Sequence, residues 1–149
     1  MTKKRYKLLF LFLLLPILLY TKTVDNILFM TENYPPYNFK KENKLQGIAV
    51  DTLVLMLEDL DSKQSRHDIK LLPWSRSYHY VLTQKNTSLF SMTRSEEREK
   101  LFKWVGPISK NVIALIAKKN KHIKIDTLND ISNYKVGVVR DDIGEELID

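Results

Sequence analysis

Strand-like and helix-like segments alternate along the chain, and this alternation constrains the fold more than any other feature. Short β-prone apolar runs predict strands at residues 26–30, 69–72 and 88–92. Amphipathic segments between them predict helices from Thr52 to about Leu60 and from Trp74 to about Gln84. Strand, helix, strand, helix, strand with short links indicates an α/β layered domain with a largely parallel sheet.

The first helix and the loop before it carry finer predictions. Asp51 is a plausible N-cap for that helix. An apolar stripe at helical spacing is predicted to face the core, and it consists of Leu53, Met56, Leu57 and Leu60. Residues 40–44 are polar and are expected to form the tip of a hairpin. The composition, 44% hydrophobic and 28% charged, is that of a globular chain that can bury such a core.

The remaining elements are predicted from local patterns. Thr93 or Ser95 is expected to cap a charged helical turn at residues 96–100. The continuous apolar run from Val112 to Ala117 is typical of a fully buried strand. A new unit follows the basic residues 118–124, and it is predicted to contain a helix at 127–131, a strand at 135–139 and a helix beginning at Asp141.

The N-terminus has the pattern of an export signal. Lys3, Lys4, Arg5 and Lys7 precede an apolar run from Leu8 to Tyr20, which is too short for the roughly 20 residues of a transmembrane helix. Residues 1–21 are therefore expected to be a signal peptide, or else an N-terminal membrane anchor, because Leu19 to Lys22 is a poor cleavage site. Without them the net charge falls from +6 to +2, with 20 basic and 18 acidic residues, so nucleic acid is not an expected partner.

The sequence carries no recognisable catalytic or metal motif. Cysteine is absent, the three histidines are scattered, and no phosphate-binding glycine loop or nucleophile elbow occurs. Glu96 and Glu97 are adjacent and would point about 100° apart on a helix, so they do not form an acid/base pair. We therefore expect no enzyme activity, no metal and no cofactor, with a small hydrolase using unmarked residues as the weakest alternative.

Polar and aromatic side chains follow the predicted parallel strands, where open α/β sheets place their ligands. They are Tyr34 and Tyr37 after the first strand, Trp74 after the second, and Ser91, Thr93, Arg94 and Arg98 after the third. Each also has a structural interpretation. Trp74 is equally well a core aromatic, Tyr37 a ring packed on prolines, and Arg94 or Arg98 a surface partner of the acidic residues 96–99.

Several motifs give the chain a family resemblance. The segment from Pro73-Trp74-Ser75-Arg76 through Ser91-Met92-Thr93-Arg94-Ser95-Glu96-Glu97-Arg98 to Val105-Gly106-Pro107 resembles the extracellular solute-binding proteins of family 3. These are periplasmic receptors of ABC importers for polar amino acids and related solutes. Tyr34-Pro35-Pro36-Tyr37, residues 47–51 and residues 128–139 follow in the family's order.

The resemblance implies a periplasmic binding protein-like fold of type II, with two hinged lobes that close on a solute like a Venus flytrap. Lobe 1 is expected at 22–117, and the hinge with the start of lobe 2 at 118–149. Family members continue well beyond that point, so lobe 2 is expected to be incomplete here, as in a truncated product, a fragment or half of a split protein. A half-built cleft is expected to bind weakly.

Residue by residue, the resemblance implies a ligand-binding set of Tyr34, Trp74, Ser91, Thr93, Arg98 and Asp142. Tyr34 takes the position of the stacking aromatic, and Ser91 and Thr93 those of hydroxyls. Arg98 takes that of the arginine that pairs with the ligand carboxylate, since Ser95-Glu96-Glu97-Arg98 resembles the family's Thr-Pro-Glu-Arg without the proline. Asp142 falls where members more often carry Gly, Ser or Thr. An aspartate there would repel a carboxylate and suit an ammonium.

The expected function is that of an exported, periplasmic solute-binding protein. It would deliver a small polar, amino-acid-like solute to an ABC transporter membrane permease, and an uncleaved signal segment would hold it at the inner membrane. Two alternatives stay open: a ligand-sensing module of a signalling or cell-wall-lytic system, and a degenerate product without binding activity.

Overall fold

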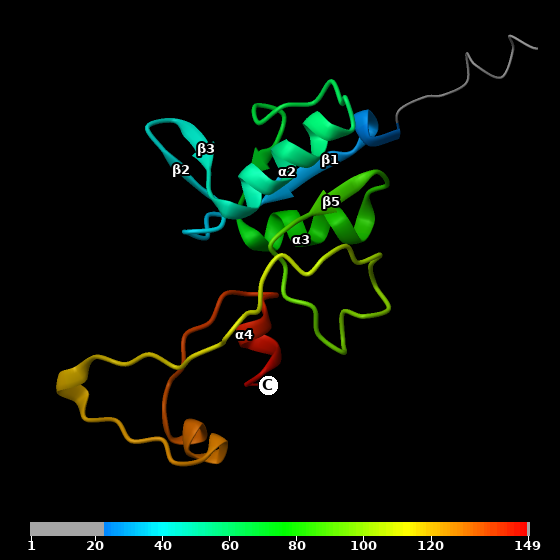
Figure 1. The fold of residues 1–149 in the computed structure, drawn as a ribbon. Coiled ribbons are helices and arrows are strands. Elements are labelled where there is room, and N and C mark those ends of the chain that lie inside the picture. The colour runs from blue at the N-terminus through cyan, green and yellow to red at the C-terminus, as the bar shows by residue number, and fades with distance from the viewer. Residues whose placement is uncertain (1–22, 149) are drawn as a thin grey trace, which may run out of the picture.

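The computed structural model describes residues 23–148, so the predicted signal segment lies outside the described residues. A three-stranded parallel sheet, two helices and a hairpin form the packed part of the chain (Figure 1). Its elements are η2 (Thr23–Asn26), β1 (Leu28–Thr31), β2 (Phe39–Lys41), β3 (Lys44–Gln46), α2 (Ile48–Asp59), β4 (Lys70–Leu71), α3 (Trp74–Thr83) and β5 (Thr87–Leu89). The predicted α/β class is confirmed.

The sheet has the order β4-β1-β5, with β1 in the middle. Met30 pairs with Lys70 on one side and with Leu89 on the other. Because successive residues of a strand face opposite sides of a sheet, Phe29 and Met30 serve two separate cores. Phe29 packs with Val50 and Leu57 of α2. Met30 packs with Trp74 of α3 and Leu89 of β5, so the sheet lies between the two helices.

The predicted hairpin is confirmed. β2 and β3 pair antiparallel, with Lys41 opposite Lys44. Glu42 and Asn43 form the two-residue turn with φ of 49° and 62°. Positive φ at both central residues matches the right-handed twist of the strands, and asparagine tolerates it better than most residues.

Helix α2 begins four residues earlier than predicted. Gly47, not Asp51, is its N-cap, and the first helical amides donate to carbonyls of the preceding loop, Ile48 to Pro36 at 3.2 Å and Ala49 to Tyr37 at 2.9 Å. These carbonyls satisfy donors that a side-chain cap would otherwise serve. The prediction of Asp51 as the cap is therefore wrong.

The buried face of α2 agrees in part with the predicted stripe, because Leu53 and Leu57 lie in the core as expected. Val50 and Leu57 are fully buried, and Leu53 packs against them. Met56 and Leu60, predicted to be core, are about half exposed at 47% and 52%. The apolar residues of this helix cover more than one face, so spacing alone did not define the buried one.

The predicted second strand and second helix are confirmed as β4 and α3. The predicted strand at 88–92 is shorter and earlier, because β5 ends at Leu89 and Ser91 takes a φ of 64°, which a strand does not accommodate. Residues 96–100 form turns, not a regular helix. Ser95 is the residue that caps them, since its Oγ accepts from the Arg98 amide at 3.4 Å.

Residues 105–140 leave the sheet, extend away from it and turn back (Figure 1). The predicted buried strand at 112–117 is wrong, since these residues form no strand and are exposed, Ile116 to 93%. The predicted strand at 135–139 is absent as well. An apolar run becomes a buried strand only if a neighbour offers backbone partners, and no strand of residues 23–148 lies beside either run.

Short helices complete the C-terminal part: the 3₁₀ helices η3 (Lys119–Lys121) and η4 (Leu128–Asn133), and α4 (Ile143–Glu146). Thr127 and Asp130 form a capping box at η4, where the sequence predicted a helix. Asp142 is the N-cap residue of α4, and Ile143 is buried. Among the residues described, none belongs to a helix with the length and hydropathy needed to cross a bilayer.

Candidate ligand-binding site

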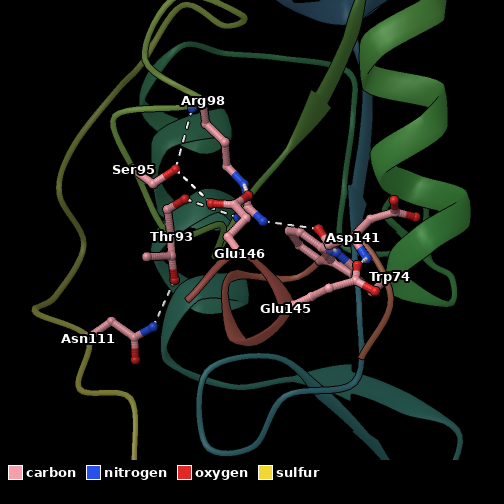
Figure 2. Close-up of polar contacts among 8 residues, drawn as sticks. All are labelled: Trp74, Thr93, Ser95, Arg98, Asn111, Asp141, Glu145 and Glu146. Atoms are coloured by element: carbon pink, nitrogen blue, oxygen red, sulfur yellow. Dashed lines mark hydrogen bonds and ion pairs between the residues drawn. The ribbon is translucent and has the colours of Figure 1, made fainter. Parts of the chain in front are cut away.

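The candidate site lies where the chain leaves β5 and where α4 returns to the sheet domain. Figure 2 shows Arg98 reaching from the turn after β5 toward Trp74 of α3 and toward residues 141–146. Segments more than 40 residues apart in the sequence therefore meet around one side chain, since Arg98 contacts both Thr93 and Asp141.

Arg98 is fully buried, with 0% of its surface exposed. Its two terminal nitrogens donate to main-chain carbonyls, one to Thr93 at 3.3 Å and one to Asp141 at 3.0 Å. An arginine stays charged in proteins, so burial requires that acceptors or anions compensate the guanidinium. Two carbonyl dipoles supply part of this compensation.

A carboxylate supplies the rest. Oε1 of Glu146 lies 2.5 Å from Nε of Arg98 and forms an ion pair with it. The Nε–H does not point at this oxygen, so Nε has no hydrogen-bond acceptor. The other oxygen, Oε2, accepts a hydrogen bond from Ser95 Oγ at 2.9 Å. The Glu146 carboxylate is thus bound by one guanidinium and one hydroxyl (Figure 2).

Aromatic rings form the wall behind the guanidinium. The Arg98 guanidinium carbon lies 5.5 Å from the Trp74 ring centroid and 5.2 Å from that of Tyr78. The two rings stack on each other at 5.6 Å, and Trp74 is 4% exposed. Such distances give cation–π attraction, and the rings exclude water from the ion pair.

Asp141 connects Trp74, Arg98 and α4 through its main chain. Its carbonyl accepts from Trp74 Nε1 at 2.8 Å as well as from Arg98. Its amide donates to Glu145 Oε2 at 2.6 Å, and its φ is 61°. Aspartate is among the residues that tolerate this left-handed conformation.

Thr93 contributes both its main chain and its side chain. Its carbonyl accepts from Arg98, and its Oγ1 accepts from Asn111 Nδ2 at 2.7 Å. The hydroxyl therefore has a partner from the segment that leaves the sheet domain. Ser91 differs, because its Oγ is buried without a hydrogen-bond partner. A buried hydroxyl without a partner costs free energy, so Ser91 Oγ would gain from a hydrogen-bonding group placed next to it.

A second acidic group lies at the end of β1. Burial raises the pKa of the Glu32 carboxyl above its usual range, and the nearby negative charge of Asp142 raises it further. Asn38, which is fully buried, donates from Nδ2 to the Glu32 carbonyl at 2.5 Å. Asp142 is therefore close to a carboxylate of the sheet domain. A positively charged group between the two would relieve their repulsion.

Tyr34 lies in a different environment from the Arg98 cluster. It bridges to Asn38 and stacks on Tyr37 with ring centroids 5.8 Å apart, and it is 43% exposed. The structure thus brings Trp74, Thr93 and Arg98 together with the segment that contains Asp142. Tyr34 lies in the turn after β1 and is about half exposed.

The two arginines of this region have opposite environments. Arg94 is exposed, and its Nε and one terminal nitrogen contact both carboxylate oxygens of Glu99 at 2.6 and 2.5 Å. The guanidinium of Arg94 also lies 5.7 Å from the Trp104 ring. The surface-pair interpretation thus describes Arg94, whereas Arg98 is buried.

The sequence analysis did not predict several residues of this site. They are Tyr78, Asp141 and Glu146 around the guanidinium, and Glu32 beside Asp142. Tyr78 had a usable signal, because it lies four residues after Trp74 on the same helix. Glu146 had none, since it meets Arg98 only after the chain has left the sheet domain and returned. Residues 23–148 contain no cluster of His, Cys, Asp and Glu able to hold a metal ion.

The buried arginine lies beyond the carboxyl ends of parallel strands, which is where open α/β sheets place their ligands. The chain belongs to the bacterial extracellular solute-binding proteins, family 3, whose family model matches residues 27–145. Its fold is that of the periplasmic binding proteins, and members of this family bind solutes and are not enzymes. Searches of curated proteins and of solved structures gave no match.

Proposed function

We propose that this protein is exported to the periplasm, where it captures a small polar, amino-acid-like solute for an ABC transporter permease. In this proposal residues 22–117 are lobe 1, residues 118–149 are the hinge and the start of lobe 2, and the solute binds between them. Residues 1–21 direct export. The observation that carries the proposal is the buried guanidinium of Arg98, already bound to a carboxylate and backed by Trp74.

Each proposed ligand-binding residue has a chemical role. Arg98 pairs with the solute carboxylate, Ser91 and Thr93 offer hydroxyls, and Trp74 supplies an apolar wall. Asp142, close to Glu32, attracts the solute's ammonium group. Tyr34 covers the solute from the turn after β1.

Calorimetric titration with each of the 20 common L-amino acids tests the proposal. For any amino acid that binds, Arg98→Lys should weaken affinity roughly tenfold or more, because lysine lacks the planar fork that meets a carboxylate. The matched control is Arg94→Lys, whose parent side chain is exposed and paired with Glu99. If Arg94→Lys abolished binding and Arg98→Lys left it intact, with both variants folded, the assignment of Arg98 would be wrong.

Export is tested separately by fractionating bacteria that express a tagged full chain. We expect the protein in the periplasm, or at the inner membrane if residues 1–21 are not cleaved. Replacing Lys3, Lys4, Arg5 and Lys7 with glutamate should retain it in the cytoplasm. A wholly cytoplasmic location of the unmodified chain would contradict the proposal.

A further inference from the structure

The carboxylate of Glu146 is bound in the way that a solute carboxylate would be. One of its oxygens contacts the Arg98 guanidinium at 2.5 Å, and the other accepts from Ser95 Oγ at 2.9 Å. A guanidinium with a neighbouring hydroxyl is a common donor set for carboxylates in proteins. The position is already filled from within the chain.

In the observed arrangement this guanidinium is not accessible to a second carboxylate. Both terminal nitrogens donate to carbonyls, the aromatic rings of Trp74 and Tyr78 lie within 5.5 Å, and the residue has no exposed surface. Its Nε lies against Oε1 of Glu146. A second anion would have to approach the first, and two carboxylates at one site repel each other strongly.

The internal pair is also imperfect. Nε–H is not directed at the Glu146 oxygen, although the two atoms are in contact. The Glu146 side chain is 22% exposed, and it lies at the last residue of a four-residue helix. It can therefore rotate into solvent without breaking a strand or a long helix. An external carboxylate aligned with the Nε–H would gain the hydrogen bond that Glu146 lacks.

We propose that Glu146 is an internal occupant of the carboxylate position, and that a solute carrying a carboxylate binds by exchanging with it. This inference rests on the proposed function, because it specifies how the same site is regulated. While no solute is bound, Glu146 neutralises the charge of the Arg98 guanidinium. Every carboxylate solute therefore has to compete with Glu146 for this position.

Small carboxylates test the exchange without knowledge of the natural solute. Glu146→Ala should lower the melting temperature, because it leaves a buried cation without its anion. Acetate or formate should then restore the melting temperature in a saturable way, and chloride at equal ionic strength should not. Acetate should also shift the Nε–H signal of Arg98 in nitrogen-15 NMR spectra of Glu146→Ala. The control is Glu97→Ala, which removes an exposed carboxylate from the same turn as Arg98.

Acetate that acts equally on Glu146→Ala and Glu97→Ala, or on neither, would overturn the inference. If Glu146→Ala does not fold, Glu146→Gln provides the test, since its amide keeps the shape of the side chain and can accept from Ser95. In Glu146→Gln, the affinity for acetate should rise about tenfold over the parent chain, the difference that one charge-assisted hydrogen bond makes. An unchanged affinity would also overturn it.

Amino-acid titrations separate this inference from the proposed function. Acetate rescue without binding of any amino acid would uphold the carboxylate position and contradict the proposed function. Amino acids that bind the parent chain and Glu146→Gln with equal affinity would uphold the proposed function and refute the exchange. Amides of the same amino acids, which lack the carboxylate, should bind both forms equally weakly.

Discussion

At the scale of single residues, Arg98 links the C-terminal part of the described chain to the sheet domain. It binds the Asp141 carbonyl and the Glu146 carboxylate, and it also binds the Thr93 carbonyl of the sheet domain. One buried guanidinium therefore joins two segments that share few other polar contacts.

Arg98→Ala should destabilise the folded protein by about 3 to 5 kcal/mol, the usual cost of breaking a buried ion pair by removing one partner. Urea unfolding followed by circular dichroism measures this free energy. Arg94→Ala, at an exposed pair, should change the midpoint by no more than the scatter between repeats. A small effect of Arg98→Ala would show that water replaces the guanidinium at little cost.

Glu32 gives a pH-dependent prediction. Burial, and then the charge of Asp142, raise the pKa of Glu32 in the folded state above the ordinary 4.5. The folded protein thus binds this proton more tightly than the unfolded chain does. The resulting stabilisation is full below 4.5 and is lost as the pH rises through the raised pKa.

Glu32→Gln should therefore raise the free energy of unfolding at neutral pH and leave it nearly unchanged below pH 4.5. Urea titrations at the two pH values measure both quantities. In an Asp142→Asn background the gain from Glu32→Gln should shrink, since one cause of the raised pKa is gone. A larger gain at the lower pH would show that the pKa of Glu32 is lowered and not raised.

At the scale of single elements, Gly47 determines where α2 begins. Its φ is 124°, and a Cβ at this position would lie 2.4 Å from the Tyr37 carbonyl oxygen, the same oxygen that accepts from the Ala49 amide. A side chain would therefore strain the backbone and displace the carbonyl that caps the helix.

Gly47→Ala should destabilise the protein by about 2 kcal/mol or more, measured as the free energy of unfolding in urea. Gly137→Ala is the matched control, because an added Cβ there meets no atom within 4 Å and the residue is not in the left-handed region. Equal effects of the two substitutions would mean that the loop carrying Tyr37 moves away without cost.

The elements predicted correctly are those defined by local pattern. The central strand β1, the hairpin turn and helix α3 each follow from residues within a few positions of one another. The start of α2 did not, because carbonyls of Pro36 and Tyr37 replace a side-chain cap. The apolar run at 112–117 shows the same limit, since whether it is buried depends on a neighbouring strand and not on its own residues.

The residues of the candidate site also divide into those that the sequence predicted and those that it did not. The family resemblance pointed to Arg98, Thr93 and Trp74, and the structure places these three residues in one cluster. The contact between Arg98 and Glu146 spans 48 positions, and no periodicity relates them. Conversely, Tyr34 packs on its own turn, since proximity to the end of a strand does not determine where a side chain points.

At the scale of the whole molecule, the sheet domain and the extended segment differ in how well their backbones are protected. Amides of β1 lie between two paired strands and beneath both helices. Residues 112–117 form no strand or helix and are exposed. Protection from exchange requires a hydrogen bond that opens rarely.

Hydrogen exchange followed by mass spectrometry should therefore show full labelling of residues 112–117 within seconds, while β1 stays protected for far longer. The hairpin β2–β3, paired on one side only, should lie between these extremes. Slow exchange at 112–117 would indicate that this run is paired in solution, for example with a second molecule.

The position of Trp74 makes its intrinsic fluorescence a probe of the Arg98 site. The indole is buried, donates to the Asp141 carbonyl and faces the Arg98 guanidinium, so its fluorescence depends on the charges next to that guanidinium. The chain has two tryptophans, and Trp104→Phe would leave Trp74 as the single emitter. Its emission would then record, in real time and without a label, whether the anion beside Arg98 comes from the chain or from solution.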